Sequence, residues 1–382
     1  MRNNARFAHV QTFDIDRVAA AAGSDPDVLR MENLDTDVPP PPNAVAATAR
    51  ALTDGQGNSW LPFNGLPVLR EALAADLRER TGLDYDPARQ ILVTSSGTAA
   101  VMPVLLATTE PGQRVVLTDP TYAGLLQRVR LAGAQPHLVP LRVEGGMWRL
   151  DRDALAQVTE AAAIIMMSPS MPAGVVLTRE DWSAVAEACE RLDAYLIYDA
   201  AMERIVFSGH PRINPCTVDG LAARTIIIGS VSKEYRMIGW RIGWVAGPAD
   251  ILSRVLVAVT YNTTVAGGFS QIGAAVALSE PSGVAEAVAE YQARHEAVVR
   301  ALDGLVPLVR AAGGWSCLVD AEELGIGARE LSDRLLARGR VAATPMTAWG
   351  EEVARRYVRL VYSNEPVKRL DELRDRFTAA LT

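Results

Sequence analysis

Two cationic side chains stand eight residues apart in a mostly apolar segment, SVSKEYRMIGWRIGW, at residues 230–244. They are Lys233 and Arg241. A charge in a half-buried segment is costly unless it is paired, neutralised or used in chemistry. A lysine amine can form a Schiff base with an aldehyde, and an arginine can bind a phosphate through paired hydrogen bonds. The question is which ligand would use both groups.

Polar groups also follow three other short apolar runs. Residues 95–98, SSGT, come after ILVT and precede a helical pattern. Hydroxyl and free N–H groups at a helix N-terminus form an anion site, although a plain helix cap explains these residues equally well when they are taken alone. Tyr122 comes shortly after VVL, and Asp199 follows YLIY. Taken singly, core packing explains the tyrosine, and a helix cap or a core ion pair explains the aspartate.

One ligand accounts for the whole set of residues. An aromatic pyridinium phosphate needs an anion site, a ring to stack on, a carboxylate for its ring nitrogen and an amine for its aldehyde. A Schiff-base lysine and an acid facing the pyridine nitrogen are the marks of pyridoxal phosphate sites. The sequence therefore predicts pyridoxal 5'-phosphate as the cofactor, with Lys233 and Asp199 in these two roles.

The pattern of apolar residues predicts the sheet that would bring these groups together. Short apolar runs recur as QILVTS, RVVLTD, PHLVPL, AAIIMMS, AYLIYDA, RTIIIGS and RIGWVAG. Most are apolar at successive positions, as in strands that are buried on both faces. Segments between several of them, such as residues 98–109 and 179–193, have helical patterns. We expect an α/β fold with a mainly parallel doubly wound sheet, in which ligands bind beyond the carboxyl ends of the strands.

The chain divides into three expected parts. Residues 1–42 are polar and end in DVPPPP, which excludes a helix or a central strand there, so they are expected to form an arm that packs on the small domain. Residues 43–285 would form the large cofactor-binding domain. A long helical stretch around residues 268–305 would join it to a smaller α+β domain, residues 286–382.

Composition argues against several other classes of protein. The chain has 382 residues and a net charge of −7, which disfavours a nucleic-acid partner because such a partner needs a basic face. No apolar run approaches the roughly 20 residues that cross a bilayer. The first residues lack the apolar core of a signal peptide, so we expect a cytoplasmic protein without a membrane partner. Three scattered cysteines and four dispersed histidines indicate neither a disulfide framework nor a metal site.

These motifs resemble those of fold-type I pyridoxal phosphate enzymes of the class I/II aminotransferase family, and the similarity runs over nearly the whole chain. SVSKEYRMIGWRIGW resembles the lysine segment of that family. The resemblance implies that Lys233 is the Schiff-base lysine and that Ser230 and Arg241 are phosphate ligands. It also implies the aminotransferase-like fold of type I.

Three further motifs resemble cofactor-binding segments of the same family. SSGTAA resembles its phosphate loop, which implies that Ser96, Gly97 and Thr98 hold the phosphate. DPTYAG resembles the segment whose aromatic ring stacks on the cofactor, which implies Tyr122. YLIYDAAMERIVF resembles the strand whose acid pairs with the pyridine nitrogen, which implies Asp199. The catalytic residues are then expected to be Lys233, Asp199 and Tyr122.

The resemblance also implies residues that bind the substrate. YVRLVYS resembles the segment whose arginine binds the substrate α-carboxylate, here Arg359. NSWLPFNGLPVLREAL resembles the segment whose aromatic residue reaches into the neighbouring subunit's site, here Trp60. Asn33, beside Glu32 in the arm, is expected to line the pocket. Because the site is shared between subunits in this family, we expect a homodimer in which Trp60 and residues 262–264 reach across.

Four positions depart from the family pattern. Met171 and Met202 replace an asparagine and a tyrosine that serve the cofactor's phenolic oxygen, Trp60 replaces a frequent tyrosine, and Leu34 stands where relatives often have glycine. Without the two donors the phenolate shares its charge mainly with the Schiff-base proton, which favours the protonated form. We expect this Schiff base to stay protonated through neutral pH, unless another side chain or water supplies the donor.

The predicted function is an aminotransferase acting on an amino acid and a keto acid. The altered phenolate environment leaves a second hypothesis open, in which the same cofactor supports a β- or γ-elimination, for example at a carbon–sulfur bond, or an oxygen-dependent oxidation or decarboxylation. A third hypothesis, a ligand-sensing domain of a transcription regulator, is disfavoured because the chain is acidic and has no N-terminal helix-turn-helix module. The sequence does not identify the substrate side chain.

Overall fold

The structure, a computed structural model, describes residues 7–12 and 14–382, and eight strands in these residues form the sheet that positions the site. They lie in the order β2-β9-β8-β7-β6-β3-β4-β5. Their bounds are β2 Ile91–Thr94, β3 Arg114–Asp119, β4 Gln135–Glu144, β5 Met147–Leu150, β6 Ala163–Met167, β7 Tyr195–Asp199, β8 Thr225–Ser230 and β9 Gly243–Ala246. Strands β8, β7, β6, β3 and β4 pair in parallel, whereas β9 and β5 are antiparallel to their neighbours. The predicted mainly parallel sheet is confirmed.

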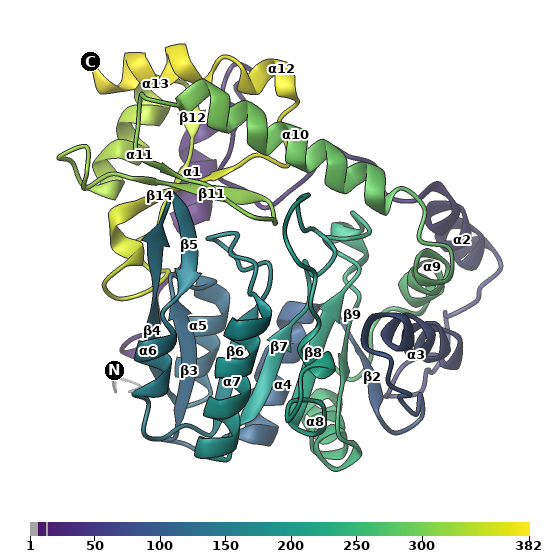
Figure 1. The fold of residues 1–382 in the computed structure, drawn as a ribbon. Helices are drawn as coiled ribbons and strands as arrows, with labels where there is room; N and C mark the ends of the chain where they lie inside the picture. The colour runs from purple at the N-terminus through teal and green to yellow at the C-terminus, as the bar shows by residue number, and fades with distance from the viewer. Residues whose placement is uncertain (1–6, 13) are drawn as a thin grey trace, which may run out of the picture.

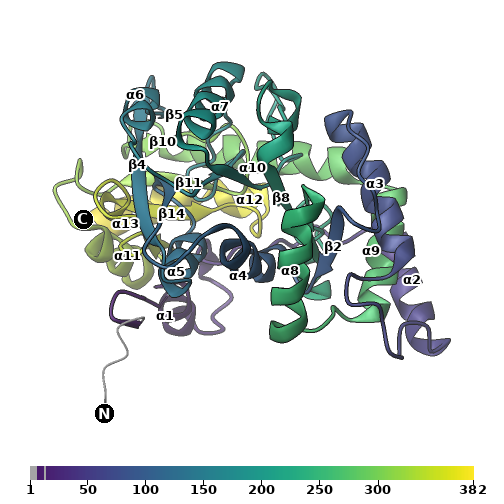
Figure 2. The ribbon, with the colours of Figure 1, turned by 90° about the horizontal axis from the view of Figure 1, so that it is seen from below.

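Helices cover both faces of this sheet, which explains why its central strands have apolar residues at successive positions. Helices α4 (Gly97–Thr108), α5 (Ala123–Leu131) and α8 (Ala249–Asn262) lie on one face (Figures 1 and 2). Helices α6 (Arg152–Ala156) and α7 (Arg179–Leu192) lie on the other. The central strand β8 is consequently buried along its whole length. The seven predicted strand segments are all strands, and β5 is a further strand that the pattern did not predict.

Three helices pack together beside strand β2, at the end of the sheet opposite β5. They are α2 (Pro42–Thr53), α3 (Pro67–Thr81) and α9 (Gly268–Ser279), and Figure 2 shows them grouped at one side of the molecule. Helix α3 ends at Gly82, whose φ of 71° is the left-handed conformation of a helix cap.

The smaller part of the structure is built on an antiparallel sheet of β10 (Leu308–Val309), β11 (Ser316–Asp320), β14 (Tyr357–Val361) and β13 (Thr344–Pro345). Its helices are α10 (Val284–Leu302), α11 (Ala328–Ala337), α12 (Val367–Leu370) and α13 (Leu373–Leu381). The N-terminal segment adds helix α1 (Asp14–Ala22) and strand β1 (Leu29–Arg30), which pairs in parallel with β12 (Val341–Ala342). The expected arm, residues 1–42, includes residues 1–6 and 13, which lie outside the described residues.

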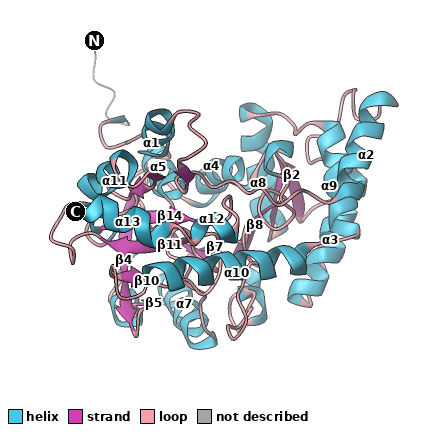
Figure 3. Ribbon diagram, turned by 90° about the horizontal axis from the view of Figure 1, so that it is seen from above, coloured by secondary structure: helices cyan, strands magenta, loops and turns pink. Residues whose placement is uncertain are grey.

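The long helical stretch expected around residues 268–305 is two helices, α9 and α10. The break falls between Glu280 and Gly283, where Pro281 lacks a backbone donor and Gly283 has a φ of 70°. Figures 1 and 3 show α10 running from the helices of the smaller part toward α9. Only the second of the two helices therefore connects the two parts.

The described ranges, 7–12 and 14–382, contain no helix with both the length and the apolar character needed to span a membrane. In the same residues no group of three or more histidine, cysteine or acidic side chains is arranged to hold a metal ion. Cys189, Cys216 and Cys317 are each buried with a free thiol.

Candidate active site

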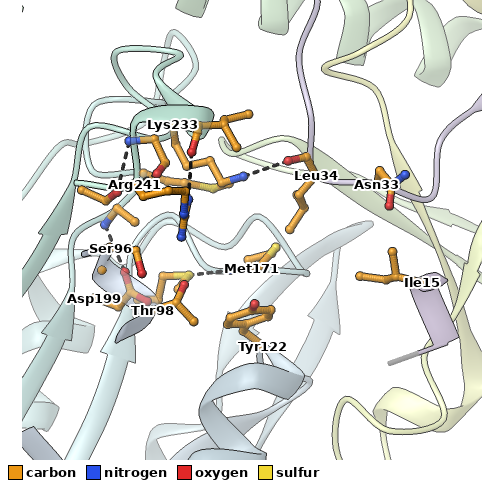
Figure 4. Close-up of a pocket in the computed structure, with 17 residues that line it drawn as sticks. Ile15, Asn33, Leu34, Ser96, Thr98, Tyr122, Met171, Asp199, Lys233 and Arg241 are labelled. Carbon is orange, nitrogen blue, oxygen red and sulfur yellow. Dashed lines mark hydrogen bonds between the residues drawn. The ribbon is translucent and has the colours of Figure 1, made fainter. Parts of the chain in front are cut away.

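A pocket lies where strands β7 and β8 end and helix α4 begins (Figure 4). Nine of the eleven residues that the sequence predicted for the site line this pocket. They are Asn33, Ser96, Gly97, Thr98, Tyr122, Asp199, Ser230, Lys233 and Arg241. These residues come from five separate segments of the chain, and all except Asn33 belong to segments at the carboxyl edge of the sheet, where ligands of such folds bind. Arg359 and Trp60 are not among the lining residues.

The N-terminus of α4 forms one end of the pocket. Ser96 is the N-cap of this helix, and its Oγ accepts a hydrogen bond of 2.9 Å from Ala99 N. A Cβ atom at Gly97 would lie 3.2 Å from the carbonyl oxygen of Gly229, so glycine allows the helix to start close against β8. The free N–H groups and positive dipole of a helix N-terminus favour an anion. This end of the pocket is suited to a phosphate.

Two residues of the predicted lysine segment face the same end. Ser230, at the end of β8, donates to the carbonyl of Ile242 over 3.0 Å and bonds to the Ser232 hydroxyl over 2.8 Å. Arg241 has a φ of 55°, and its Nη1 donates to the carbonyl of Ile238 over 2.8 Å. The Arg241 side chain is exposed, so its remaining N–H groups can reach a phosphate.

Asp199 is a buried carboxylate at the carboxyl end of β7. Its side chain is 8% exposed, and its Oδ1 accepts a hydrogen bond of 3.1 Å from Ala201 N. Burial raises its pKa to about 6, although the Ala201 bond and the charge of Lys233 oppose the shift. A buried carboxylate of this kind is stabilised by a cation, such as a protonated pyridine nitrogen.

Lys233 follows β8 and reaches into the pocket. Its Nζ donates a hydrogen bond of 3.0 Å to the carbonyl of Leu34 and lies 4.5 Å from the centroid of the Trp315 ring. Burial lowers the pKa of this amine to about 7. An amine with a pKa near 7 has a large neutral fraction at physiological pH, as a nucleophile or a base requires.

The chain contains two lysines, Lys233 and Lys368. Lys368 is exposed on helix α12 and does not line the pocket. Any covalent attachment of an aldehyde to a lysine in this pocket is therefore restricted to Lys233. The small number of lysines is visible in the sequence and is a further argument for Lys233.

Tyr122 presents its ring to the pocket from the N-terminus of α5. A Cβ atom at Gly124 would lie 2.6 Å from the Tyr122 ring, so glycine provides the space that the ring occupies. The ring centroid lies 5.8 Å from that of Trp349, and burial raises the pKa of the Tyr122 hydroxyl. The hydroxyl is consequently neutral at physiological pH, and the ring can act as an aromatic stacking surface.

Arg359 lies behind the pocket wall, on strand β14. Its side chain is fully buried, and its Nη2 donates to the carbonyl of Glu32 and, over 3.3 Å, to the Thr344 hydroxyl. Burial lowers the pKa of the guanidinium to about 9. Its Nη1 lies 3.9 Å from the sulfur of Met171, which lines the pocket. The predicted carboxylate ligand is thus separated from the pocket by one methionine side chain.

Trp349 is a site residue that the sequence analysis missed. The Cζ atom of Arg359 lies 4.4 Å from its ring centroid, and the ring neighbours Tyr122. The backbone around it is fixed by Asp119, whose carboxylate accepts hydrogen bonds from the N–H groups of residues 351–354. Trp315 was missed as well. Both tryptophans stand next to a glycine in loops, and their contacts come from segments far away in the sequence.

Trp60 lies outside the pocket of its own chain. Its side chain is 81% exposed, and its ring contacts Phe63 at a centroid distance of 5.5 Å. Tyr261 is also largely exposed, and so are the neighbouring residues 262–264. Within one chain these groups are not brought to the site.

Methionine side chains form an apolar wall of the pocket. Met167, Met171 and Met202 all line it, and the backbone N–H of Met171 donates to the Met167 sulfur over 3.0 Å. Met171 and Met202, the two methionines that depart from the family pattern, therefore face the predicted cofactor position. A thioether cannot donate a hydrogen bond.

A buried charge network supports the lysine segment from behind. Arg80 on α3 pairs with Glu234 at 2.8 Å, with Glu203 at 3.2 Å and with Asp76 at 2.8 Å. Glu234 directly follows Lys233, and Glu203 directly follows Met202. The network therefore links α3 to both segments that flank the pocket.

The groups in this pocket fit pyridoxal phosphate. The α4 N-terminus and Arg241 provide an anion site, and Asp199 is buried without an arginine or a lysine within salt-bridge distance among the described residues. Lys233 provides the amine and Tyr122 the ring. Each chemical feature of the cofactor has a matching group in one pocket.

Comparisons with known proteins agree with this geometry. The family model described as "Aminotransferase class I and II" matches residues 28–377. A probable N-succinyldiaminopimelate aminotransferase of Mycobacterium tuberculosis is 34% identical over 319 residues, which cover 82% of this chain and 80% of the relative. An aspartate aminotransferase of Pyrococcus abyssi is 30% identical over 387 residues, which cover 100% of this chain and 98% of the relative.

Solved structures are similar over the whole chain. The structure of N-succinyldiaminopimelate aminotransferase from Mycobacterium tuberculosis superimposes with a TM-score of 0.92 at 30% identity and covers 100% of both chains. An aromatic aminotransferase from Pyrococcus horikoshii gives a TM-score of 0.87 at 29% identity and covers 95% of this chain and 97% of its own. The similarity extends over both sheets.

Proposed function

The chain belongs to the class I and II aminotransferase family and is a pyridoxal phosphate-dependent aminotransferase of fold type I, and from this premise we propose that Lys233 is the residue that binds the cofactor covalently. The observation that carries this proposal is the position of the Lys233 amine in the same pocket as the Asp199 carboxylate and the α4 N-terminus. The only other lysine, Lys368, is exposed outside the pocket.

When it is bound, pyridoxal phosphate accepts the electron pair of the breaking Cα–H bond and carries the amino group from an amino acid to a keto acid. Ser96, Gly97, Thr98, Ser230 and Arg241 would hold its phosphate. Asp199 would keep a proton on the pyridine nitrogen by placing a negative charge in a buried site. Tyr122 would restrain the ring by stacking.

Lys233 would also act as the base that moves the substrate's α-proton. Its pKa of about 7 supports this role because a base works best when its pKa lies near the working pH. Arg359 would bind the α-carboxylate of the amino acid. Its buried guanidinium lies behind Met171, and its Nε has no hydrogen-bond partner among the described residues.

We further propose a homodimer with shared sites. The large exposure of Trp60 and Tyr261 supports it, because a ring that reaches a partner's pocket must extend away from its own chain. In the dimer, Trp60 and residues 262–264 would reach the partner's pocket. A Trp60→Ala variant should keep its cofactor spectrum but lose activity, and analytical ultracentrifugation tests the dimer itself. A monomeric active protein would contradict this proposal.

The same three domains are proposed as in the sequence prediction: the arm 1–42, the large domain 43–285 and the small domain 286–382. The pairing of β1 with β12 supports the arm, and the packing of α10 against the smaller sheet supports a boundary near its start. We place the enzyme in the cytoplasm, and its three buried free thiols agree with a reducing compartment. Cell fractionation tests this location.

The reaction is tested by adding a panel of amino acids to the purified holoenzyme. For an aminotransferase we expect a stable aminated cofactor that absorbs at shorter wavelength and returns to the aldehyde form when a keto acid is added. Release of pyruvate together with ammonia would instead indicate an elimination, and oxygen uptake would indicate an oxidation. These are the alternative reactions that Met171 and Met202 suggest.

A further inference from the structure

We propose that the ring of Trp315 and the carbonyl of Leu34 form a holding site for the Lys233 amine, which the amine occupies whenever it is not joined to the cofactor. The inference rests on the proposed function, in which Lys233 binds the cofactor covalently. Trp315 would then be a positioning residue for proton transfer. The Nζ atom is 3.0 Å from the Leu34 oxygen and 4.5 Å from the Trp315 ring centroid.

The backbone that carries Trp315 is fixed on both sides. Gly314 has a φ of 79°, its N–H donates to the carbonyl of Ile205 over 2.8 Å, and its carbonyl accepts from the Tyr362 hydroxyl over 3.1 Å. A Cβ atom at Gly313 would lie 2.3 Å from the carbonyl of Ile205. The two glycines therefore let the loop pack against the segment that follows β7, and Trp315 starts from a defined position.

The segment that carries the Leu34 carbonyl is held to the same ring. The Tyr291 and Trp315 rings form a T-shaped pair at a centroid distance of 5.3 Å, and the Tyr291 hydroxyl is 2.9 Å from that of Thr36. Thr36 lies two residues after Leu34. Ring and carbonyl are thus parts of one connected assembly, and the amine reaches both at once.

The lysine segment is tied to this assembly independently of the amine. Arg236, three residues after Lys233, donates from Nε to the carbonyl of Pro39 over 3.0 Å and from Nη1 to the carbonyl of Glu234 over 2.9 Å. Arg236 is buried, and its bond to Glu234 is shielded from water. The backbone near Lys233 would keep its place when the amine leaves the cofactor.

A carbonyl oxygen and the face of an indole both favour a cation. Burial and the charges of Arg359 and Arg241 oppose the ammonium form of Lys233, whereas Asp35 and Asp199 support it. Removing the Trp315 ring takes away one group that supports the cation. The amine should then lose its proton at a lower pH, because its neutral form becomes relatively more stable.

The test uses the cofactor-free protein, in which Lys233 is a free amine. The rate at which added pyridoxal phosphate bonds to the protein is followed by absorbance from pH 5.5 to 9, because only the neutral amine can attack the aldehyde. The cofactor's own ionisations affect the rate equally in all variants, so a difference in midpoint between variants reports on the protein. We expect the midpoint of the rate to fall by about 0.5–1 pH unit in Trp315→Leu, and by less in Trp315→Phe. The matched control, Trp148→Leu, removes a buried indole on β5 that does not line the pocket, and it should leave the midpoint unchanged.

A fluorinated tryptophan tests the same point without a change in packing. Fluorine weakens the negative face of the ring, so the labelled wild type should show a lower midpoint than the unlabelled protein. The same label in Trp315→Phe should give no further shift in the midpoint. This comparison controls for any effect of fluorine on the other six tryptophans. An unchanged midpoint in Trp315→Leu and in the labelled wild type would overturn the holding site. Failure of every protein to attach the cofactor would instead overturn the assignment of Lys233.

Discussion

Asp199 is the residue whose surroundings depend most on the cofactor. It is a carboxylate buried at the end of β7, and burial raises its pKa to about 6 in the structure described here. A cationic pyridine nitrogen beside it would stabilise the charged form and lower this pKa. The residue and the ring are thus expected to stabilise each other's charges.

We predict that Asp199→Asn lowers kcat by roughly 10²–10³-fold, because the ring loses the charge that keeps its nitrogen protonated. Steady-state kinetics at saturating pyridoxal phosphate measure the effect, and the absorbance of the bound cofactor shows that the site is loaded. The control is Asp219→Asn, an exposed aspartate outside the pocket. A loaded Asp199→Asn enzyme within a few-fold of wild type would refute the role.

Met171 and Met202 offer no donor to the cofactor's phenolic oxygen. The nitrogen that joins Lys233 to the cofactor is therefore expected to hold its proton through neutral pH, and the yellow absorbance should persist there. Met171→Asn and Met202→Tyr each add a donor that stabilises the phenolate. As the pH is raised, the yellow form of each variant should therefore disappear about 0.5–1 pH unit earlier than that of the wild type. Met171→Leu changes the sulfur without adding a donor. Equal titration midpoints in all four proteins would show that another group already supplies the hydrogen bond.

At the scale of elements, helix α3 supports the pocket through Arg80. Its buried guanidinium pairs with Asp76, Glu203 and Glu234, and burial raises the pKa of Glu203. Removing one partner from such a network leaves buried carboxylates without a counter-charge. The segments after β7 and β8 would lose a common attachment point.

We expect Arg80→Met to reduce the free energy of unfolding by about 3–5 kcal/mol. Urea unfolding, followed by circular dichroism, measures this loss. Arg78→Met on the same helix is the matched control, because Arg78 is exposed and its pair with Asp84 is open to solvent, so its loss should have little effect. Equal urea midpoints for the two variants would contradict a supporting role for the network.

The strands of the large sheet were largely predictable from the sequence. Because the central strands are buried on both faces, they appear in the sequence as short continuous runs of apolar residues. Strand β5 was missed since its pattern is short and alternating, and β1 and β12 were missed since each has two residues. The break between α9 and α10 was visible in Pro281 and Gly283, but the apolar periodicity on either side outweighed it.

Most of the predicted site lines one pocket because the carboxyl ends of parallel strands meet at one edge. The sequence could not show that Arg359 stacks on Trp349 behind Met171, or that Trp315 faces Lys233. Those contacts join segments that are far apart in the chain, and no local pattern encodes them. Trp60 could be assigned a role only through the family resemblance, since in one chain it is exposed.

At the scale of the whole molecule, we expect the buried His295 to make the free energy of unfolding depend on pH. It is buried on α10, where its ring packs with those of Phe207 and Tyr362, and its Nε2 accepts a hydrogen bond of 3.1 Å from Ala311 N. Burial lowers its pKa to about 4, compared with 6.5 for the exposed side chain. Below pH 6.5 this histidine is protonated in the unfolded chain, whereas in the folded protein it stays neutral until about pH 4. The free energy of unfolding therefore decreases as the pH falls from 6.5 to 4.

The loss should amount to about 3 kcal/mol between pH 6.5 and pH 4. We predict that His295→Gln, which keeps an acceptor but does not titrate, flattens this part of the stability profile relative to wild type. Urea midpoints at half-unit pH steps provide the measurement, and His137→Gln on β4 is the control. Parallel profiles for wild type and His295→Gln would show that other groups cause the acid sensitivity.

The central claim is that the cofactor is bonded to Lys233, and borohydride reduction followed by peptide mapping tests it most directly. Reduction converts the bond to a stable amine, and the primary amines that could carry the added mass are those of the two lysines and of the chain's amino terminus. We predict that the mass is found on the Lys233 peptide, persists in Lys368→Ala and is absent in Lys233→Ala. Mass on the Lys368 peptide, or on neither peptide of a cofactor-saturated protein, would contradict the account.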